Sequence, residues 1–117
     1  MQEIRKAIDW FKESAESIDI KDQLILMHCI SVYPAPLEDA NLNSIKFLQD
    51  QTGLNVGYSN HVKGILAPIV SIALGANLIE VHFTDSRDNK IFHDHLLSLN
   101  PKELLELEIM VQDMILV

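Results

Sequence analysis

The strongest constraint on the fold is a strand-like apolar stretch that recurs three times, at residues 23–33, 54–59 and 77–84. Each stretch is apolar nearly throughout, which is the pattern of a strand with both faces buried in a parallel sheet. Segments with helical spacing lie between the stretches, at residues 39–51 and 65–76. Strands that alternate with helices predict an α/β fold with a parallel sheet and helical crossovers.

Two further helices are expected at the ends of the chain. Residues 3–17 place apolar side chains every three or four positions, which is typical of an amphipathic helix. Asn100, Pro101 and Glu103 predict a capped helix start, with asparagine at the N-cap, proline in the first turn and glutamate in a capping box. Residues 85–98 precede this helix and are expected to form a polar loop.

A sheet of three parallel strands leaves two edges without hydrogen-bonded neighbours, which soluble proteins usually cover. The strand–helix repeat has the length found in the (β/α)₈, or TIM, barrel, whose whole chain has about 250 residues. With 117 residues, this chain is expected to be a partial TIM barrel made of about the last three strands with their helices. Residues 1–117 then form a single partial-barrel domain. We expect the other strands on a second chain, in further copies of this chain, or lost by truncation.

The composition narrows the classes of function. Hydrophobic residues make up 48% of the chain and charged residues 22%, which is typical of a soluble globular protein. The formal net charge of −8 argues against nucleic acid or an anionic membrane as a partner. The longest nearly apolar stretch has 12 residues, too few to span a bilayer. The single cysteine, Cys29, fits a reducing compartment, so we expect a cytoplasmic protein.

Polar side chains stand where each predicted strand ends. In parallel α/β folds, the carboxyl ends of the strands form the active face. The polar residues come in pairs two positions apart, and this spacing directs both side chains of a pair to the same face of the sheet. The pairs are Ser31 with Tyr33, Ser59 with His61, and Glu80 with His82.

The two histidines of these pairs suggest a shared metal site. Two imidazoles with a carboxylate nearby suit a divalent transition metal that keeps positions open for water or substrate. In this interpretation His61 and His82 are ligands, and Glu80 either ligates as well or orients a ligand. The alternative is that each histidine is hydrogen-bonded scaffolding, which is the more common role of a single histidine at a strand end.

Other residues near the first pair have structural interpretations. His28 is out of phase with Ser31 and Tyr33, which predicts a packed core histidine. Cys29 is expected to be a small buried hydrophobe. Tyr33 either belongs to the site or closes its strand by stacking on Pro34.

The region before the last helix carries further titratable residues. His93 and His95 flank Asp94, and the expected interpretation is a solvated loop, with metal or substrate contact as the alternative. Glu103, Glu106 and Glu108 in the last helix are expected to form a solvated face.

Three segments of the chain together resemble a known family. The motifs "LILMHCISVYPAPLEDANLNSIKFL", "VGYSNHVKGILAPIVSIALGANLIEVHFT" and "DHLLSLNPKEL" occur in order and without large gaps between about Leu24 and Leu105. They closely resemble the C-terminal half of the sialic acid synthase barrel. That family includes the N-acetylneuraminate, legionaminate and pseudaminate synthases and spore-coat polysaccharide relatives.

The resemblance implies a transferase of carbohydrate biosynthesis that forms a carbon–carbon bond. Such enzymes condense phosphoenolpyruvate with an N-acetylated hexose, or its phosphate, to give a nine-carbon 2-keto sugar acid, with Mn²⁺ or Mg²⁺ as the divalent metal. Carried over by position, the resemblance makes His61 and His82 the metal ligands. It also implies that Ser59 contacts the phosphate of phosphoenolpyruvate, and that Ser31 and Tyr33 contact substrate.

The same resemblance assigns catalytic residues and marks two departures. Asp94 is implied to hold the hydroxyls of the acyl sugar, and Glu80 precedes the second ligand, so both are candidate catalytic residues. Asn60 stands where the family usually has aspartate, so we expect one negative charge fewer beside the metal. Phe92 stands where the family usually has glycine and lacks its freedom at positive φ, so we expect the loop carrying Asp94 to take another path.

The resemblance further implies that parts of the complete enzyme lie outside these residues. The first half of the barrel carries the lysines that grip phosphoenolpyruvate, and a small antifreeze-like domain follows the barrel; neither matches this sequence. We therefore expect negligible synthase activity from the chain alone. The expected partners are the two substrates together with a homo-oligomer or a separately encoded companion half-barrel. The alternative is a non-catalytic remnant or interaction module.

Overall fold

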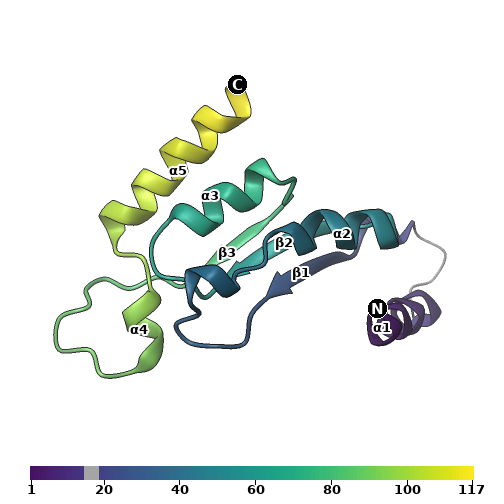
Figure 1. Cartoon of the computed structure of the whole chain (residues 1–117), viewed down its shortest axis with the longest axis horizontal. Coiled ribbons are helices and arrows are strands. Elements are labelled where there is room, and N and C mark those ends of the chain that lie inside the picture. The colour runs from purple at the N-terminus through teal and green to yellow at the C-terminus, as the bar shows by residue number, and fades with distance from the viewer. Residues whose placement is uncertain (15–18) are drawn as a thin grey trace.

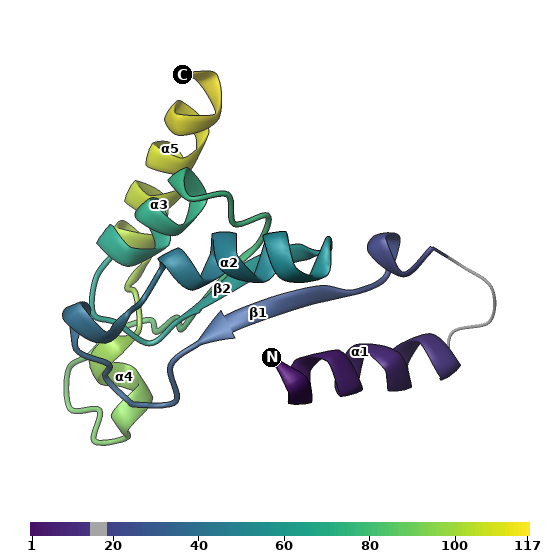
Figure 2. The ribbon, with the colours of Figure 1, turned by 45° about the vertical axis from the view of Figure 1, so that its right-hand side comes forward.

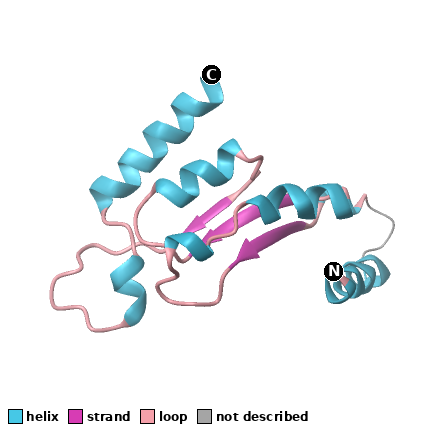
Figure 3. Ribbon diagram, viewed as in Figure 1, coloured by secondary structure: helices cyan, strands magenta, loops and turns pink. Residues whose placement is uncertain are grey.

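The structure is a computed structural model that describes residues 1–14 and 19–117 (Figure 1). Strands and helices alternate along the chain, as the sequence predicts, and the α/β class is confirmed (Figure 3). The elements are α1 (Gln2–Ser14), β1 (Ile25–Cys29), α2 (Asn43–Thr52), β2 (Asn55–Asn60), α3 (Leu66–Ala73), β3 (Ile79–Val81), α4 (His93–Leu97) and α5 (Pro101–Leu116), with 3₁₀ turns at Ile20–Asp22 and Leu37–Asp39.

The three strands form one parallel sheet in the order β1-β2-β3. Ser59 in β2 is paired with Cys29 of β1 on one side and with Glu80 of β3 on the other. Because the strands are parallel, their carboxyl ends lie at the same edge of the sheet. The polar residues that follow the strands are therefore brought together at this edge.

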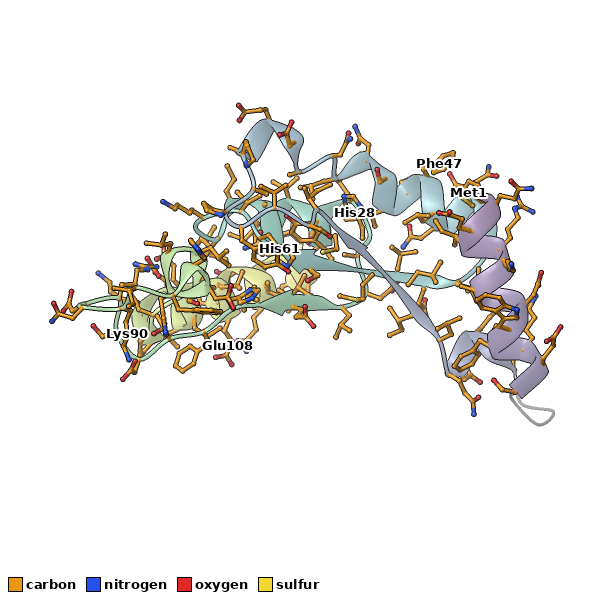
Figure 4. The ribbon with its side chains drawn as sticks, turned by 90° about the horizontal axis from the view of Figure 1, so that it is seen from below. Met1, His28, Phe47, His61, Lys90 and Glu108 are labelled. Atoms are coloured by element: carbon orange, nitrogen blue, oxygen red, sulfur yellow. The ribbon has the colours of Figure 1, made fainter. Side chains whose placement is uncertain are left out.

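Helices α2 and α3 cover one face of the sheet, and α5 packs against α3 (Figures 1 and 2). Val56 and Tyr58, at alternate positions of β2, join Ile45 of α2 in the core on this face. His28 of β1 also faces this side and is only 9% exposed, with its Nε2 2.8 Å from the carbonyl oxygen of Ala40 (Figure 4). The prediction that His28 is a core histidine is confirmed.

The opposite side of the sheet, which we call the open face, lies away from α2 and α3 (Figure 2). The positions that alternate with the core residues point to it, namely Met27, Cys29, Gly57, Ser59 and Glu80. Cys29 and Glu80 are exposed there. The candidate functional residues are therefore on this face, at the carboxyl edge of the sheet.

Strands β1 and β3 are shorter than the sequence predicts. β1 ends at Cys29 rather than at residue 33, because the backbone turns and the N–H of Val32 donates to the carbonyl of Ile30 (2.8 Å). β1 also lies at an edge of the sheet, with Ile25 39% exposed. The expectation that every strand is buried on both faces is thus wrong for β1 and correct for most of β2. β3 occupies only the central part of residues 77–84.

The region expected to be a loop, residues 85–98, contains the five-residue helix α4. At the start of α5 the predicted capping box is confirmed: the Asn100 side chain accepts from the Glu103 N–H (3.0 Å), and the Glu103 carboxylate accepts from the Asn100 N–H (2.9 Å). Glu103 also pairs with Arg87, so the expectation of a fully solvated side chain is wrong for Glu103. The Arg87 hydrogen bond, followed by that from Asn100, lowers the pKa of Glu103.

The other helix signals agree with the structure where it describes them. Helix α1 begins as predicted, and residues 15–17 of its predicted range lie outside the described residues. Gly53 ends α2 in the left-handed region at φ +67°, as expected of a C-cap glycine, and Pro68 lies in the first turn of α3. In the part of the chain that the structure describes, no helix is long and apolar enough to cross a membrane.

Candidate functional site

The site is centred on the carboxyl ends of β2 and β3. Ser59 and Glu80 are neighbours in the sheet register, and the Ser59 hydroxyl donates to Oε1 of Glu80 at 2.6 Å. Ser59 is 7% exposed, whereas Glu80 is exposed. The predicted same-face pairing therefore brings Ser59 and Glu80 into direct contact, and Glu80 binds this serine.

His61 and His82 follow these two residues and also lie together. Their ring centroids are 5.4 Å apart and the rings meet edge to face. Nδ1 of His61 lies 2.6 Å from the carbonyl oxygen of Ile30. Because a carbonyl can only accept, Nδ1 carries the proton and Nε2 of the neutral ring keeps its lone pair. His61 is 4% exposed, and the side chain of His82 is 26% exposed.

Tyr33 completes an aromatic group around the histidines. Its ring centroid is 4.0 Å from that of His61 and 5.9 Å from that of His82. The sequence left open whether Tyr33 belongs to the site, and these contacts place it there. Ser31, by contrast, is exposed beyond the end of β1, so the alternation that was expected to carry Ser31 and Tyr33 to one face stops at the turn.

Helix α4 brings Asp94 to the site. Oδ2 of Asp94 lies 4.0 Å from Nε2 of His82, and the Asp94 side chain is 40% exposed. His95, which directly follows Asp94 in α4, fixes the helix, because its Nδ1 is 3.0 Å from Oγ1 of Thr84. His95 is therefore partly buried scaffolding rather than a solvated loop residue. Phe92 precedes α4 with an ordinary extended backbone (φ −73°), so it needs no glycine-like conformation there.

A cavity of about 340 Å³ opens beside His82. It is lined by Tyr33 and His82 and by residues 92–94 at the start of α4. Asp94 supplies a carboxylate, Tyr33 and Phe92 supply exposed aromatic rings, and His82 and His93 supply imidazoles. His93 is exposed at this cavity. The arrangement can accept hydrogen bonds from hydroxyl groups and can pack against an apolar surface.

Cys29 is a site residue that the sequence interpretation missed. It is exposed on the open face, and its Sγ lies 3.7 Å from Nδ1 of His61. The expectation of a buried hydrophobe is wrong because Cys29 points to the open face, which α2 and α3 do not cover. The signal was available, since Cys29 has the same alternation phase as Ser31 and Tyr33, which were assigned to the site.

Asn60 points away from the open face. It is 1% exposed, its Oδ1 accepts from the Tyr58 hydroxyl (3.1 Å) and from the Val62 N–H (3.1 Å), and its Nδ2 donates to the Val62 carbonyl (2.8 Å). Asn60 therefore fixes the backbone that carries His61, and a charge at position 60 would lie on the core side rather than beside Ser59. Burial, with a smaller contribution from Cys29, raises the pKa of Tyr58 to about 12.

The two imidazoles can bind a metal ion, but the described residues supply only part of its coordination. Among the residues that the structure describes, no three histidine, cysteine, aspartate or glutamate side chains are grouped to hold a metal ion. Two imidazoles on one ion have ring centroids about 5 Å apart when the metal–nitrogen distances are about 2.1 Å, which is near the observed 5.4 Å. The Ile30 carbonyl also leaves Nε2 of His61 available. The described residues thus offer two nitrogen ligands.

Comparison with known proteins identifies the group to which these features belong. The NeuB family matches residues 1–116. The N,N'-diacetyllegionaminic acid synthase of Legionella pneumophila is 41% identical over 113 residues, which cover 97% of this chain and 31% of that protein. The N-acetylneuraminate-9-phosphate synthase of Drosophila melanogaster is 34% identical over 105 residues, covering 89% and 27%.

A solved structure agrees with these matches. The N-acetylneuraminic acid (sialic acid) synthetase of Leptospira borgpetersenii, in complex with citrate, superposes with a TM-score of 0.83 at 38% identity, covering 96% of this chain and 37% of that one. The chain therefore spans about a third or less of the length of the relatives it matches.

Proposed function

This chain belongs to the NeuB family of sugar acid synthases, and from that premise we propose that it is part of an enzyme that condenses phosphoenolpyruvate with an N-acetylated hexose. The product is a nine-carbon 2-keto sugar acid. The observation that carries the proposal is the pair His61 and His82 at the carboxyl edge of a parallel sheet, with Nε2 of His61 left available by the Ile30 carbonyl.

We propose further that the fold is a partial TIM barrel. Each strand is parallel to its neighbour, α2 and α3 lie on one face, and the functional side chains share the other face and one edge. In a TIM barrel the helices lie outside and the active site is at the carboxyl ends of the strands. The open face then corresponds to the barrel interior, and the edges of β1 and β3 are where further strands would pair.

His61 and His82 would hold the divalent metal, Mn²⁺ or Mg²⁺. A bound metal would supply Lewis-acid polarisation of the sugar aldehyde and would align the two substrates. The protein's own contribution is orientation: the Ile30 carbonyl fixes the tautomer of His61, and the Tyr33 ring packs against it. The deeply buried position of His61 holds its ring in one place.

The remaining site residues have roles that follow from their donors and acceptors. Ser59 would contact the phosphate of phosphoenolpyruvate, and because its one hydroxyl proton is donated to Glu80 (2.6 Å), the hydroxyl must turn from Glu80 to donate to the phosphate. Asp94 is an acceptor for the hydroxyls of the sugar. Tyr33, beside both histidines, is the substrate contact contributed by the segment after β1, whereas the role of Ser31 as a substrate contact rests on the family resemblance alone.

The chain alone is expected to lack synthase activity, because the lysines that the resemblance implies for gripping phosphoenolpyruvate would come from strands that these residues do not supply. We propose that a complementary part, either a companion half-barrel or further copies of this chain, covers the open face. The exposed Cys29 and the 39% exposed Ile25 on edge strand β1 favour such an assembly.

Manganese binding tests the proposal. Free Mn²⁺ is measured by electron paramagnetic resonance during titration of the wild-type chain and of the variants His61→Ala and His82→Ala. We expect saturable binding by the wild type and a loss of affinity of about tenfold or more in each variant. The control is His93→Ala, an exposed histidine outside the pair, which should bind as the wild type does.

Two results would refute the proposal. One is metal binding that is unaffected by both His61→Ala and His82→Ala, and the other is equal weakening by His93→Ala. The claim of incompleteness has a separate test: the purified chain is supplied with Mn²⁺, phosphoenolpyruvate and N-acetylmannosamine, and the 2-keto acid product is assayed. Steady turnover without a companion protein would contradict it.

A further inference from the structure

Two exposed aromatic residues form the rim of the cavity beside Asp94. Phe92 is 63% exposed and Tyr33 is 45% exposed, and both residues line the same cavity of about 340 Å³. Exposed aromatic rings at the edge of a pocket commonly mark a surface that packs against a ligand. Phe92 takes this position without strain, because its backbone is extended (φ −73°, ψ 137°).

The polar groups of this cavity suit a neutral polyhydroxy ligand. Asp94 carries an acceptor carboxylate at the start of α4, and its Oδ2 lies 4.0 Å from Nε2 of His82. Its oxygens can accept from sugar hydroxyls. A flat aromatic surface next to a hydroxyl acceptor is complementary to a sugar that carries an apolar acyl group beside its hydroxyls.

The charges around the cavity do not suit a phosphoryl group. Within the described residues, no lysine or arginine lines the cavity. The nearest basic residues of the preceding loop are engaged elsewhere: Lys90 lies 3.4 Å from Asp85, and Arg87 donates to the Ser98 carbonyl and to Glu103. A phosphoryl group would therefore meet the Asp94 carboxylate without the cations that normally hold it.

We propose that Phe92 is a specificity-determining residue: with Asp94, it makes the cavity select an uncharged, N-acylated hexose and disfavour a phosphorylated one. The inference rests on the proposed function, since it names the class of acceptor sugar. The names of the two relatives above differ on this point, because only one refers to a phosphate. The acyl group packs on the Phe92 ring and the sugar hydroxyls donate to Asp94.

The test is a titration of the 117-residue chain followed by ¹H–¹⁵N NMR at pH 7.5, with N-acetylmannosamine and its 6-phosphate as probes. We expect the neutral sugar to shift the amide signals of Tyr33, Phe92 and Asp94, and the 6-phosphate to bind about fivefold more weakly or worse. Phe92→Ala should weaken the neutral sugar by about threefold to tenfold. Phe92→Tyr keeps the ring and should restore binding.

Two controls separate this role from a general effect on the loop. Ile91→Ala changes the neighbouring residue, which is 98% exposed and does not line the cavity, and should leave both affinities unchanged. Asp94→Asn removes the carboxylate charge and should reduce the discrimination against the phosphate. The signals of His95 and Thr84 report whether α4 keeps its anchor in every variant.

The outcomes distinguish this inference from the proposed function. Equal or tighter binding of the 6-phosphate, or a Phe92→Ala variant that behaves as Ile91→Ala does, would overturn the role of Phe92 and leave the proposed function standing. No shift of the cavity signals with either sugar would overturn the role of this cavity in sugar binding, whereas the proposed function is tested separately by Mn²⁺ binding to His61 and His82. Loss of the neutral sugar in Phe92→Ala with recovery in Phe92→Tyr supports the inference.

Discussion

Replacing Gly57 by alanine should destabilise the sheet beneath the functional site. A Cβ at position 57 would lie 2.8 Å from the carbonyl oxygen of Leu78, 3.1 Å from Cβ of Leu78 and 2.5 Å from Sδ of Met27. The Met27 thioether can move, but the Leu78 carbonyl is held because it accepts from the Tyr58 N–H at 2.8 Å. Relief of the contact therefore requires β3 to move away from β2.

The cost follows from these contacts. Overpacking of this kind costs about 1–3 kcal/mol, and weakening the Tyr58–Leu78 hydrogen bond adds about 1 kcal/mol. We expect Gly57→Ala to lower the free energy of unfolding by about 2–4 kcal/mol. The assay is urea unfolding followed by circular dichroism, with the midpoint and the slope compared to those of the wild type.

A double variant shows which contact decides the cost. Met27→Ala in the Gly57→Ala background removes the flexible neighbour and leaves the backbone neighbour in place. We expect it not to restore stability, because the Leu78 carbonyl remains in the way. Surface substitutions usually change the free energy of unfolding by less than about 0.5 kcal/mol. A change that small in Gly57→Ala would refute the close approach of β2 and β3. Full rescue by Met27→Ala would refute the role of the backbone contact.

Three further predictions concern residues that support the site. Tyr58, whose pKa is raised from 10.0 to about 12, stabilises the fold below pH 10 and loses this contribution as the pH rises towards 12, so Tyr58→Phe should flatten the alkaline fall of the melting temperature. The hydrogen bond from Arg87 lowers the pKa of Glu103, so Glu103 stabilises the fold above its ordinary pKa of 4.5 and this contribution is lost as the pH falls. Glu103→Gln should therefore reduce the fall of the melting temperature in acid, and an unchanged fall would contradict this. Asn60→Asp keeps both acceptor contacts but loses the bond to the Val62 carbonyl and buries a charge, so urea unfolding should show a loss of about 1–3 kcal/mol.

The parallel sheet and the histidine pair were predictable because both follow from simple periodicity. Apolar runs separated by helical segments predict parallel strands, and parallel strands bring their carboxyl ends to one edge. His61 and His82 each come two positions after a polar strand residue. Given the sheet order, their proximity of 5.4 Å is a consequence of the topology, and the proximity of Asp94 agrees with the family resemblance.

The sequence pattern gave the wrong burial for Cys29 and the wrong placement for Ser31, because alternation along a strand shows neither what packs over it nor where it ends. An apolar run has the same pattern whether one or both faces of its strand are covered, so the exposure of Cys29 depends on what packs over the open face. The turn between Ile30 and Val32 is also invisible in the pattern, since it depends on a backbone hydrogen bond. Tyr33 follows this turn, and its ring centroid still lies 4.0 Å from that of His61.

Helix α4 and the role of Glu103 depend on contacts between segments. Five residues are too few for helical periodicity to show, and α4 is held by the contact between His95 and Thr84 instead. Glu103 was correctly assigned to a capping box, but its pairing with Arg87 joins two segments whose approach the sequence does not reveal. Local rules predicted the three strands and the longer helices, whereas α4 and the contacts between elements required the structure.

The central claim is that His61 and His82 hold one metal ion together, and counting the nitrogens bound to Mn²⁺ tests it most directly. Pulsed electron paramagnetic resonance of the Mn²⁺-loaded chain detects directly coordinated imidazole nitrogens. We predict two in the wild type, one in each of His61→Ala and His82→Ala, and two in His93→Ala. A spectrum without imidazole nitrogen in the wild type, or one unchanged in both single variants, would contradict the claim.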